Sequence, residues 1–283
     1  MRLNVPTSAK SPLTGTSTRR DGLDGDPAFF YGITRGVTVV VNTSVAAVLS
    51  LVSTIVSYPA TSITGNVAVW GPHTDALSPN TWKLTVTQSA PNQHSYVLEG
   101  KGKTEADSAY RVILSGSHVS TGVKLGSGSF LIDWDKAQQL PEHDTAVGTA
   151  TVTYSRTSTS DTTTVGVQFT KVRDGETGQL VDATYAYEEV PNNGGSFDFS
   201  QNKNLVPGAA IEVLTVRSRW LQSGAGRSDV KVVGGDVAGG EATANECWDS
   251  SFLSRFFTLS FDATKNYGQS SACVFSTAEY ATP

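Results

Sequence analysis

Apolar and polar residues alternate with a period of two through much of the chain after residue 66. The alternation is clearest in four segments: 82–87, 149–154, 165–170 and 183–187. A period of two places every second side chain on the same side of an extended strand, so each segment predicts a β-strand with one inward face. The connections are too short for the crossovers that parallel strands need, which excludes a parallel α/β sheet.

Short turn sequences separate these expected strands. They lie at 91–93, 158–161, 173–178, 191–195 and 223–226, and Pro, Asn, Asp, Ser and Gly are frequent in them. Turns of this length and composition join antiparallel neighbours. The pattern predicts about eleven to fourteen strands, more than a flat open sheet carries comfortably. We therefore expect a mainly β fold, with a large, curved antiparallel meander that is open or closed like a barrel.

Residues 32–58 form one strongly apolar segment with a different period. Its branched residues recur at steps of three or four, which is the helical period: Val37, Val41, Val45, Val48, Val52 and Ile55. Arg35 and regular polar positions interrupt the run of about 20 apolar residues that a membrane span needs. We expect a buried or half-buried helix over about residues 37–57, with the valine stripe facing the sheet and Thr38 and Asn42 on the polar side.

The chain before this helix has a different composition. Residues 1–27 hold three prolines, Ser and Thr clusters and a charged run, so residues 1–29 predict a flexible polar linker. Residues 30–283 are expected to form a single β-rich domain, because the helix needs the sheet to bury its apolar face. Residues 1–27 also lack the apolar core of a signal peptide, and we expect that a native secretion signal was removed and Met1 added.

The only two cysteines in the sequence are Cys247 and Cys273. Charged residues make up only 17% of the chain, and Ser, Thr and Gly are abundant, as in many secreted and envelope β proteins. An even cysteine count in such a chain favours one disulfide formed in an oxidising compartment, with two buried free thiols as the alternative. We therefore expect an extracytoplasmic protein that is periplasmic, anchored at the outer membrane or secreted.

Charge and motifs argue against several classes of function. The formal net charge is −5, whereas nucleic-acid binding needs a concentrated basic surface. The sequence contains no Cys/His cluster with metal-ligand spacing and no G-x-S-x-G motif, and its four histidines are scattered. We expect no metal, no cofactor and no nucleic-acid partner.

Asp133 and Asp135 flank Trp134 in an expected strand, so alternation places both carboxylates on the face opposite the tryptophan. Two carboxylates on one face can act as the acid and base of a hydrolase or hold a metal ion. The alternative, which we favour, is a solvated outer face.

Arg217 and Arg219 share one face of another expected strand, and either can pair with Asp229 or Asp249. Such a group forms either an ion-paired sheet surface or an anion site. Nothing in the spacing decides between the two.

Large aromatic residues are concentrated in or beside the expected strands. Core packing is the default for such side chains. In a wide sheet that closes over a helix, they can instead line a cavity for an apolar ligand. On that interpretation the ligand-lining residues are Val48, Val52, Trp82, Trp134, Phe169, Tyr185 and Trp220.

The segments 70–86, 217–230 and 246–252 resemble those of uncharacterised, lipoprotein-type envelope proteins of Gram-negative bacteria. The resemblance covers most of residues 30–276 and implies no known activity. In architecture alone, a helix with a curved sheet is similar to the Lol-type periplasmic lipoprotein carriers, whose open barrel shelters acyl chains. The chain has no sequence motif of that family, so none of its functional residues carries over.

These observations predict a non-enzymatic extracytoplasmic binding or carrier protein for an apolar or lipid-like ligand. One alternative is a structural or adhesive envelope protein with a solid core, and another is a β-rich hydrolase that acts on envelope polymers through Asp133 and Asp135. A cavity of a few hundred cubic ångströms favours the carrier, whereas a filled interior favours the structural protein. The expected partners are an apolar small molecule or a lipid, and a membrane only through a missing N-terminal lipid anchor.

Overall fold

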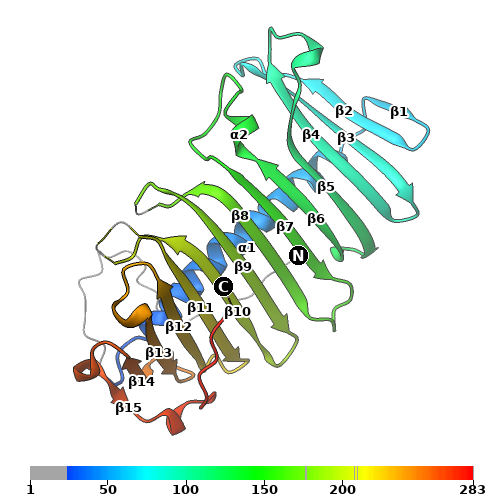
Figure 1. Ribbon diagram of the computed structural model, residues 1–283. Coiled ribbons are helices and arrows are strands. Elements are labelled where there is room, and N and C mark those ends of the chain that lie inside the picture. The colour runs from blue at the N-terminus through cyan, green and yellow to red at the C-terminus, as the bar shows by residue number, and fades with distance from the viewer. Residues whose placement is uncertain (1–23, 176, 207, 209, 283) are drawn as a thin grey trace. The chain divides into compact units, whose positions relative to one another are not determined.

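The computed structural model describes residues 24–175, 177–206, 208 and 210–282. Its strands form one antiparallel sheet of 15 strands in chain order, and one long apolar helix precedes the sheet (Figure 1). The two end strands do not pair with each other, so the sheet is not closed. The prediction of a mainly β meander with an N-terminal helix is confirmed, and the meander is of the open kind.

The elements have the following bounds. The helices are α1 (Phe29–Val56) and α2 (Trp134–Ala137), with short 3-10 turns at Asp107–Ala109, Ala238–Gly240, Ala263–Lys265 and Ser270–Ala272. The strands are β1 (Ser62–Thr64), β2 (Val67–His73), β3 (Asn80–Ala90), β4 (Gln93–Gly102), β5 (Arg111–Gly122), β6 (Leu125–Asp133), β7 (Thr149–Arg156), β8 (Thr163–Arg173), β9 (Leu180–Val190), β10 (Gly194–Lys203), β11 (Glu212–Leu221), β12 (Gly226–Gly234), β13 (Glu241–Trp248), β14 (Ser254–Leu259) and β15 (Tyr267–Gly268).

The four alternating segments lie within β3, β7, β8 and β9, and each expected turn falls between two of the observed strands. Two of these turns need an unusual backbone angle. Asn92 and Asn192 adopt φ values of 62° and 60°, in the left-handed region that asparagine tolerates better than most residues. The turn chemistry of the sequence therefore sets the hairpin positions.

The described residues fall into two compact units. The first unit, Thr43–Asp182, contains the second half of α1 and strands β1 to β8. Its buried apolar residues share one face of the sheet and pair across neighbouring strands. They include Leu84, Tyr96, Leu114, Phe130, Val152 and Val167.

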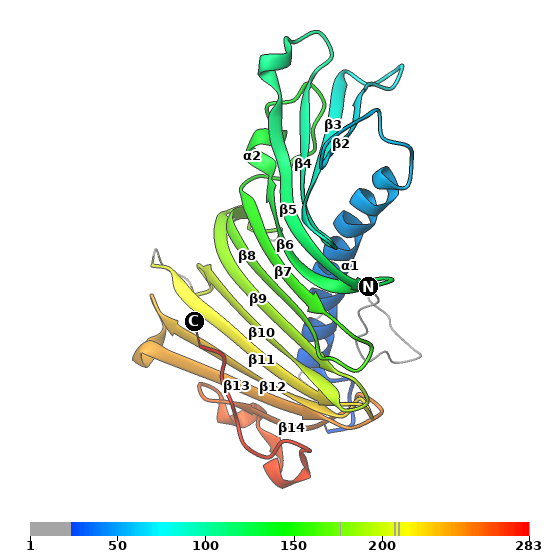
Figure 2. The same ribbon diagram turned by 90° about the vertical axis from the view of Figure 1, so that its right-hand side faces the viewer.

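The second unit combines residues 24–42 with residues 183–282. Here the first half of α1 lies along one face of the sheet, which we call the helix face (Figures 1 and 2). Side chains on the helix face include Tyr185, Phe197, Ser218, Trp220, Ser228, Glu246 and Trp248. The C-terminal residues cross the opposite face, which we call the outer face.

The bounds of α1 differ from the expected 37–57. The helix begins eight positions earlier, at Phe29, and it ends at Val56, close to the expected end. Asn42, which the sequence placed on the polar side of the helix, lies in its middle. The expected linker, residues 1–29, is largely outside the described residues.

The orientation of α1 on the sheet is also not the expected one. Thr34, Thr38 and Asn42 recur at steps of four and are buried, whereas the sequence placed Thr38 and Asn42 on the polar, outward side. In the expected inward stripe only Val45 is buried, and Val37, Val41, Val48 and Val52 are half-buried. The physical reason is that the helix face presents hydroxyl groups, which the polar stripe of α1 can satisfy.

Candidate functional site

Polar side chains join α1 to the helix face of the second unit. Thr34 Oγ1 and Ser218 Oγ lie 2.6 Å apart, and Ser218 Oγ lies 3.0 Å from Ser228 Oγ. Two turns further along α1, Tyr185 Oη donates a 2.8 Å hydrogen bond to Asn42 Oδ1. All five residues are buried. A rotation of α1 would leave these groups without partners, so the hydrogen bonds fix which side of the helix faces the sheet.

The threonines of this stripe also bond to their own helix. Thr34 Oγ1 donates to Phe30 O at 2.8 Å, and Thr38 Oγ1 donates to Thr34 O at 2.7 Å. A hydroxyl that bonds back one turn is satisfied without water. The hydroxyl groups of Thr34 and Thr38 therefore keep hydrogen-bond partners although both residues are buried.

Aromatic residues anchor the first turn of α1. Tyr31 stacks on Phe252 with ring centroids 4.4 Å apart and lies 5.7 Å from the Trp248 ring. Phe30 stacks on Phe257 at 6.0 Å. Buried aromatic pairs of this kind stabilise by about 0.5–1.5 kcal/mol beyond their area burial. Ring contacts thus hold the start of α1 in addition to its hydrogen bonds.

Glu246, on β13, caps the N-terminus of α1. Its Oε1 accepts a 3.1 Å hydrogen bond from Phe29 N and its Oε2 accepts a 2.6 Å hydrogen bond from Phe30 N. The first amide groups of a helix have no partner within the helix and carry partial positive charge, so a carboxylate suits this place. Burial raises the pKa of Glu246, while its hydrogen bonds with Phe30 N and Ser254 oppose that rise.

The opposite side of α1 is apolar and exposed. Phe29 is 59% exposed and Val40 66% exposed, and Ile33 and Val39 are exposed as well. We call these four residues the outward stripe. A polar stripe facing inward and an apolar stripe facing outward reverse the usual arrangement of a surface helix.

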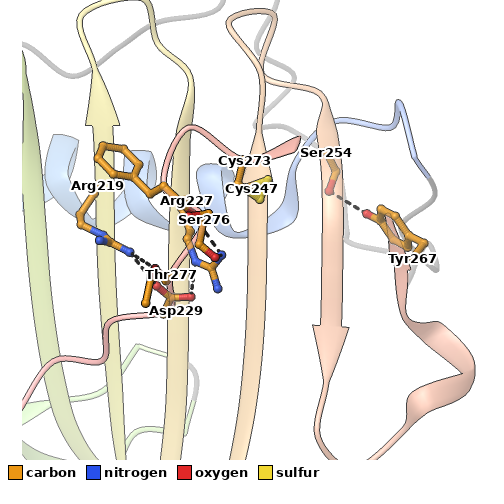
Figure 3. The surroundings of a disulfide bond; sticks show 10 residues. Arg219, Arg227, Asp229, Cys247, Ser254, Tyr267, Cys273, Ser276 and Thr277 are labelled. Atoms are coloured by element: carbon orange, nitrogen blue, oxygen red, sulfur yellow. Dashed lines mark hydrogen bonds and ion pairs between the residues drawn. A yellow bond between two sulfur atoms is a disulfide. The ribbon is translucent and has the colours of Figure 1, made fainter. Parts of the chain in front are cut away.

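The outer face of the second unit carries a buried ionic cluster (Figure 3). Asp229, which is 0% exposed, pairs with Arg227 Nε at 2.7 Å and with Arg219 Nη2 at 3.2 Å. Arg219 and Arg227 are direct cross-strand partners, and like charges in this position repel each other. The Asp229 carboxylate, which pairs with both, compensates this repulsion. Removal of one partner of a buried ion pair destabilises a protein by more than the pair itself stabilises it, because the remaining charge is left buried without water or a counter-charge.

A C-terminal strap, residues 273–282, covers this cluster. Arg227 Nη1 donates to Phe275 O and Ser276 O at 3.2 Å, and Arg219 Nη2 donates to Thr277 O at 2.8 Å. The strap therefore binds through its backbone carbonyls, which three strap residues supply in succession.

Glu279 adds side-chain and backbone contacts to the same cluster. Its carboxylate pairs with Arg219 and, at 3.4 Å, with Arg217 Nε. Its backbone N–H donates to Asp229 Oδ2 at 2.9 Å. Strap and sheet thus share one charge network.

A disulfide joins Cys247 and Cys273, with the two Cα atoms 5.7 Å apart, as the sequence predicted (Figure 3). The bond attaches the start of the strap to β13. The disulfide and the apolar N-terminal helix are consistent with an extracytoplasmic location.

The expected pairing of the arginines holds in part. Arg219 pairs with Asp229 as predicted, whereas Arg217 pairs with Asp198 at 2.7 Å. Asp249 instead pairs with Arg255 at 2.8 Å. The ion-paired surface is therefore present, and it is covered by the strap.

The expected strand around Trp134 ends earlier than predicted. β6 stops at Asp133 and α2 begins at Trp134, so the alternation that placed two carboxylates on one face does not apply. Asp133 Oδ1 accepts a 2.9 Å hydrogen bond from Lys136 N, and Asp135 Oδ1 accepts one of 2.7 Å from Gly148 N. Both carboxylates hold the backbone of this turn.

The seven expected ligand-lining residues are distributed over both units. Val48, Val52, Trp82, Trp134 and Phe169 belong to the first unit, and Tyr185 and Trp220 to the second. Trp82 lies over Gly100, Tyr185 binds Asn42, and the Trp220 ring lies 6.0 Å from Tyr187.

One pair of histidines, which the sequence reading treated as scattered, is brought together in the first unit. His94 and His118 are cross-strand partners on β4 and β5, and His118 Nδ1 lies 3.0 Å from Tyr154 Oη. Burial, and secondarily the neighbouring His94, lower the pKa of His118. The sequence did not predict this pair, because the pairing depends on the register of the hairpin that β4 and β5 form.

Comparison with known proteins found no matching family model, no matching curated protein and no matching solved structure.

Proposed function

We propose that this chain is a non-enzymatic extracytoplasmic binding protein whose apolar partner is a lipid surface, bound by the outward stripe of α1. The observation that carries the proposal is the reversed orientation of α1 in the second unit. Its polar residues bind the sheet, and its apolar residues Phe29, Ile33, Val39 and Val40 are left exposed. Apolar patches of this kind mark contact sites for proteins or membranes.

The composition of α1 favours lipid as the partner. Among the described helices, α1 is the one that is long and apolar enough, by length and composition, to cross a membrane. Arg35 is its only charged residue. In the proposed state α1 stays on its sheet and only the outward stripe enters the lipid, as in helices that lie at a membrane interface.

The size of the stripe indicates reversible binding. Complete burial of one large apolar side chain contributes about 1.5–3 kcal/mol, so four that are roughly half exposed contribute roughly 3–6 kcal/mol. A single myristoyl chain binds membranes with an association constant of about 10⁴ M⁻¹, or roughly 5.5 kcal/mol. The outward stripe is therefore comparable to one lipid anchor, and weaker than a permanent one.

The sequence suggested an apolar ligand in a cavity that the sheet forms with the helix, whereas the outward stripe lies on the other side of α1. A carrier would hold its ligand between the helix and the sheet. In the second unit that interface is occupied by hydrogen bonds such as Tyr185–Asn42 and by ring contacts such as Tyr31–Trp248. We therefore place the lipid outside α1, with the disulfide supporting an extracytoplasmic site of action.

Flotation with phosphatidylcholine vesicles tests the proposal. We expect the wild-type protein to float with the vesicles and the double variant Phe29→Ser, Val40→Ser to remain in the dense fraction. The matched control is Val123→Ser, which replaces an equally apolar side chain, 91% exposed, in the turn between β5 and β6. This control is expected to float like the wild type.

Circular dichroism and thermal melting must show that all three proteins are folded. Equal flotation of the wild type and the double variant, or no flotation of the folded wild type, would exclude lipid binding by α1.

A structural role through self-assembly is the second candidate, and one observation favours it. Gly32 and Gly36 are one helical turn apart on α1, and a Cβ atom at either position would meet nothing within 4 Å. Two such glycines in an apolar helix allow another helix to approach closely. If α1 mediates assembly, light scattering will show oligomers without lipid, and Gly36→Leu will dissociate them.

A further inference from the structure

A small pocket lies on the outer face of the second unit, between the strap and the sheet. Its volume is about 310 Å³. The lining residues are Thr184, Tyr185 and Ala186 of β9, Asp198, Phe199 and Ser200 of β10, Arg217 of β11, and Tyr280, Ala281 and Thr282 of the strap. The pocket is thus completed by the strap that the disulfide attaches.

One carboxylate oxygen in this pocket has an unused hydrogen-bonding capacity. Asp198 Oδ2 accepts a 2.7 Å hydrogen bond from Arg217 Nη1. Asp198 Oδ1 is buried and accepts no hydrogen bond from any described residue. The side chain of Asp198 as a whole is 34% exposed and lines the pocket, so its carboxylate can accept a further hydrogen bond from a ligand there.

The charges of the ion-paired groups at the pocket cancel. Arg217, Arg219 and Arg227 face the three carboxylates of Asp198, Asp229 and Glu279 in one connected network. A ligand with a net charge of either sign would disturb this balance. A neutral ligand with hydroxyl donors can hydrogen-bond to the Asp198 carboxylate and leave the network intact.

The walls suit a ligand that is part polar and part apolar. Thr184 and Ser200 are hydroxyl-bearing residues of the lining, and Ala186 and Ala281 are apolar ones. Tyr280 is held in place by a 2.9 Å hydrogen bond from its hydroxyl to Asn245 Oδ1. The volume is at the lower end of the range for small-molecule sites, which fits one ring-sized ligand.

We infer that this pocket binds a neutral saccharide unit, with the Asp198 carboxylate accepting hydrogen bonds from its hydroxyl groups and the strap forming one wall. The saccharide pocket is independent of the proposed lipid contact, because the two lie on opposite faces of the sheet in the second unit. A free sugar and the terminal unit of a glycan present the same chemistry to it.

Saturation-transfer NMR with the oxidised, full-length protein tests the inference. The probes are methyl α-glucopyranoside, methyl β-galactopyranoside and N-acetylglucosamine at millimolar concentration, together with a glycan array that distinguishes free sugars from chain ends. We expect binding of at least one probe, and a loss of at least tenfold in affinity in the Asp198→Asn variant. Ala186→Trp, which fills the pocket from an exposed position on β9, is expected to abolish binding.

Glu188→Gln is the matched control, because Glu188 lies on the same face of β9 and does not line the pocket. It should bind the probes like the wild type, and thermal melting should show that all variants are folded. The inference is overturned if no probe and no glycan binds the folded wild type. It is equally overturned if the folded Asp198→Asn and Ala186→Trp variants bind as well as the wild type.

Discussion

Glu246 Oε2 accepts a 2.6 Å hydrogen bond from Phe30 N, although the two residues are 216 positions apart in the sequence. α1 has no acidic residue in its own first turn, so a strand near the end of the chain supplies the cap. The contact fixes where α1 starts, and the adjacent aromatic packing of Tyr31 fixes how it rests on the sheet.

Replacement of Glu246 by Ala should destabilise the protein by about 2–6 kcal/mol at a pH below 4.5, where the contribution of Glu246 is fully present. The substitution leaves two buried or half-buried amides, Phe29 N and Phe30 N, without an acceptor, and each such loss costs about 1–3 kcal/mol. Urea unfolding followed by circular dichroism measures the change. A loss below about 0.5 kcal/mol, which is usual for surface substitutions, would mean that the cap does not exist in solution.

Removal of the buried carboxylate on the outer face should be more damaging. Asp229→Asn leaves Arg219 and Arg227 facing each other without their shared counter-charge, and we expect a loss of about 3–5 kcal/mol in the free energy of unfolding. The combined variant Arg227→Met, Asp229→Leu should be less destabilised than Asp229→Asn alone, because fewer uncompensated charges remain. Denaturant titration of both variants gives the comparison, and additive losses in the combined variant would contradict this account.

The disulfide should hold the strap against the sheet. Titration of the unreduced, denatured protein should detect no free thiol, and Cys273→Ser should lower the free energy of unfolding by roughly 3 kcal/mol for a loop of this size. Proteolysis of that variant should cut first in the strap, residues 273–282. Two free thiols in the unreduced wild type would contradict the bond.

The contributions of two buried glutamates, Glu212 and Glu246, to the free energy of unfolding should depend on pH in opposite directions. The backbone N–H groups of Asp236, Leu205 and Val206 lower the pKa of Glu212 below its ordinary value of 4.5. Its contribution to stability is therefore present above pH 4.5 and is lost as the pH falls through the lowered pKa. Burial raises the pKa of Glu246, so its contribution is present below pH 4.5 and is lost as the pH rises through the raised pKa.

Comparison of Glu212→Gln and Glu246→Gln with the wild type separates the two effects. The stability lost in Glu212→Gln should shrink as the pH is lowered below 4.5, whereas the stability lost in Glu246→Gln should shrink as the pH is raised above it. Thermal melting across this pH range measures both. The same pH slope for the two variants would show that one of the assigned causes is wrong.

The sequence predicted the strands well because a local pattern determines them. The alternation in 149–154 and the turn residues at 191–195 act over a few positions, and hairpin pairing then extends them into a sheet. The pairing of Cys247 with Cys273 needed only a count of two cysteines.

The sequence did not predict how α1 sits on the sheet. Hydropathy along 37–57 cannot show that the sheet offers Ser218 and Tyr185 as hydrogen-bonding partners, because those residues are more than 140 positions away. The cap by Glu246 and the pairing of His94 with His118 depend on register in the same way. Contacts between distant segments, which make up both candidate sites, were therefore outside the reach of the local patterns.

Hydroxyl-radical footprinting of Phe29 and Phe30 tests the central claim, the reversed orientation of α1, most directly. The two neighbours are chemically identical, but Phe29 is 59% exposed on the outward stripe and Phe30 is 8% exposed against the sheet. We expect Phe29 to be oxidised several times faster than Phe30 in the free protein, and phosphatidylcholine vesicles to protect Phe29 alone. Oxidation of Phe30 at the same rate as Phe29, or faster, in the free folded protein would contradict the account.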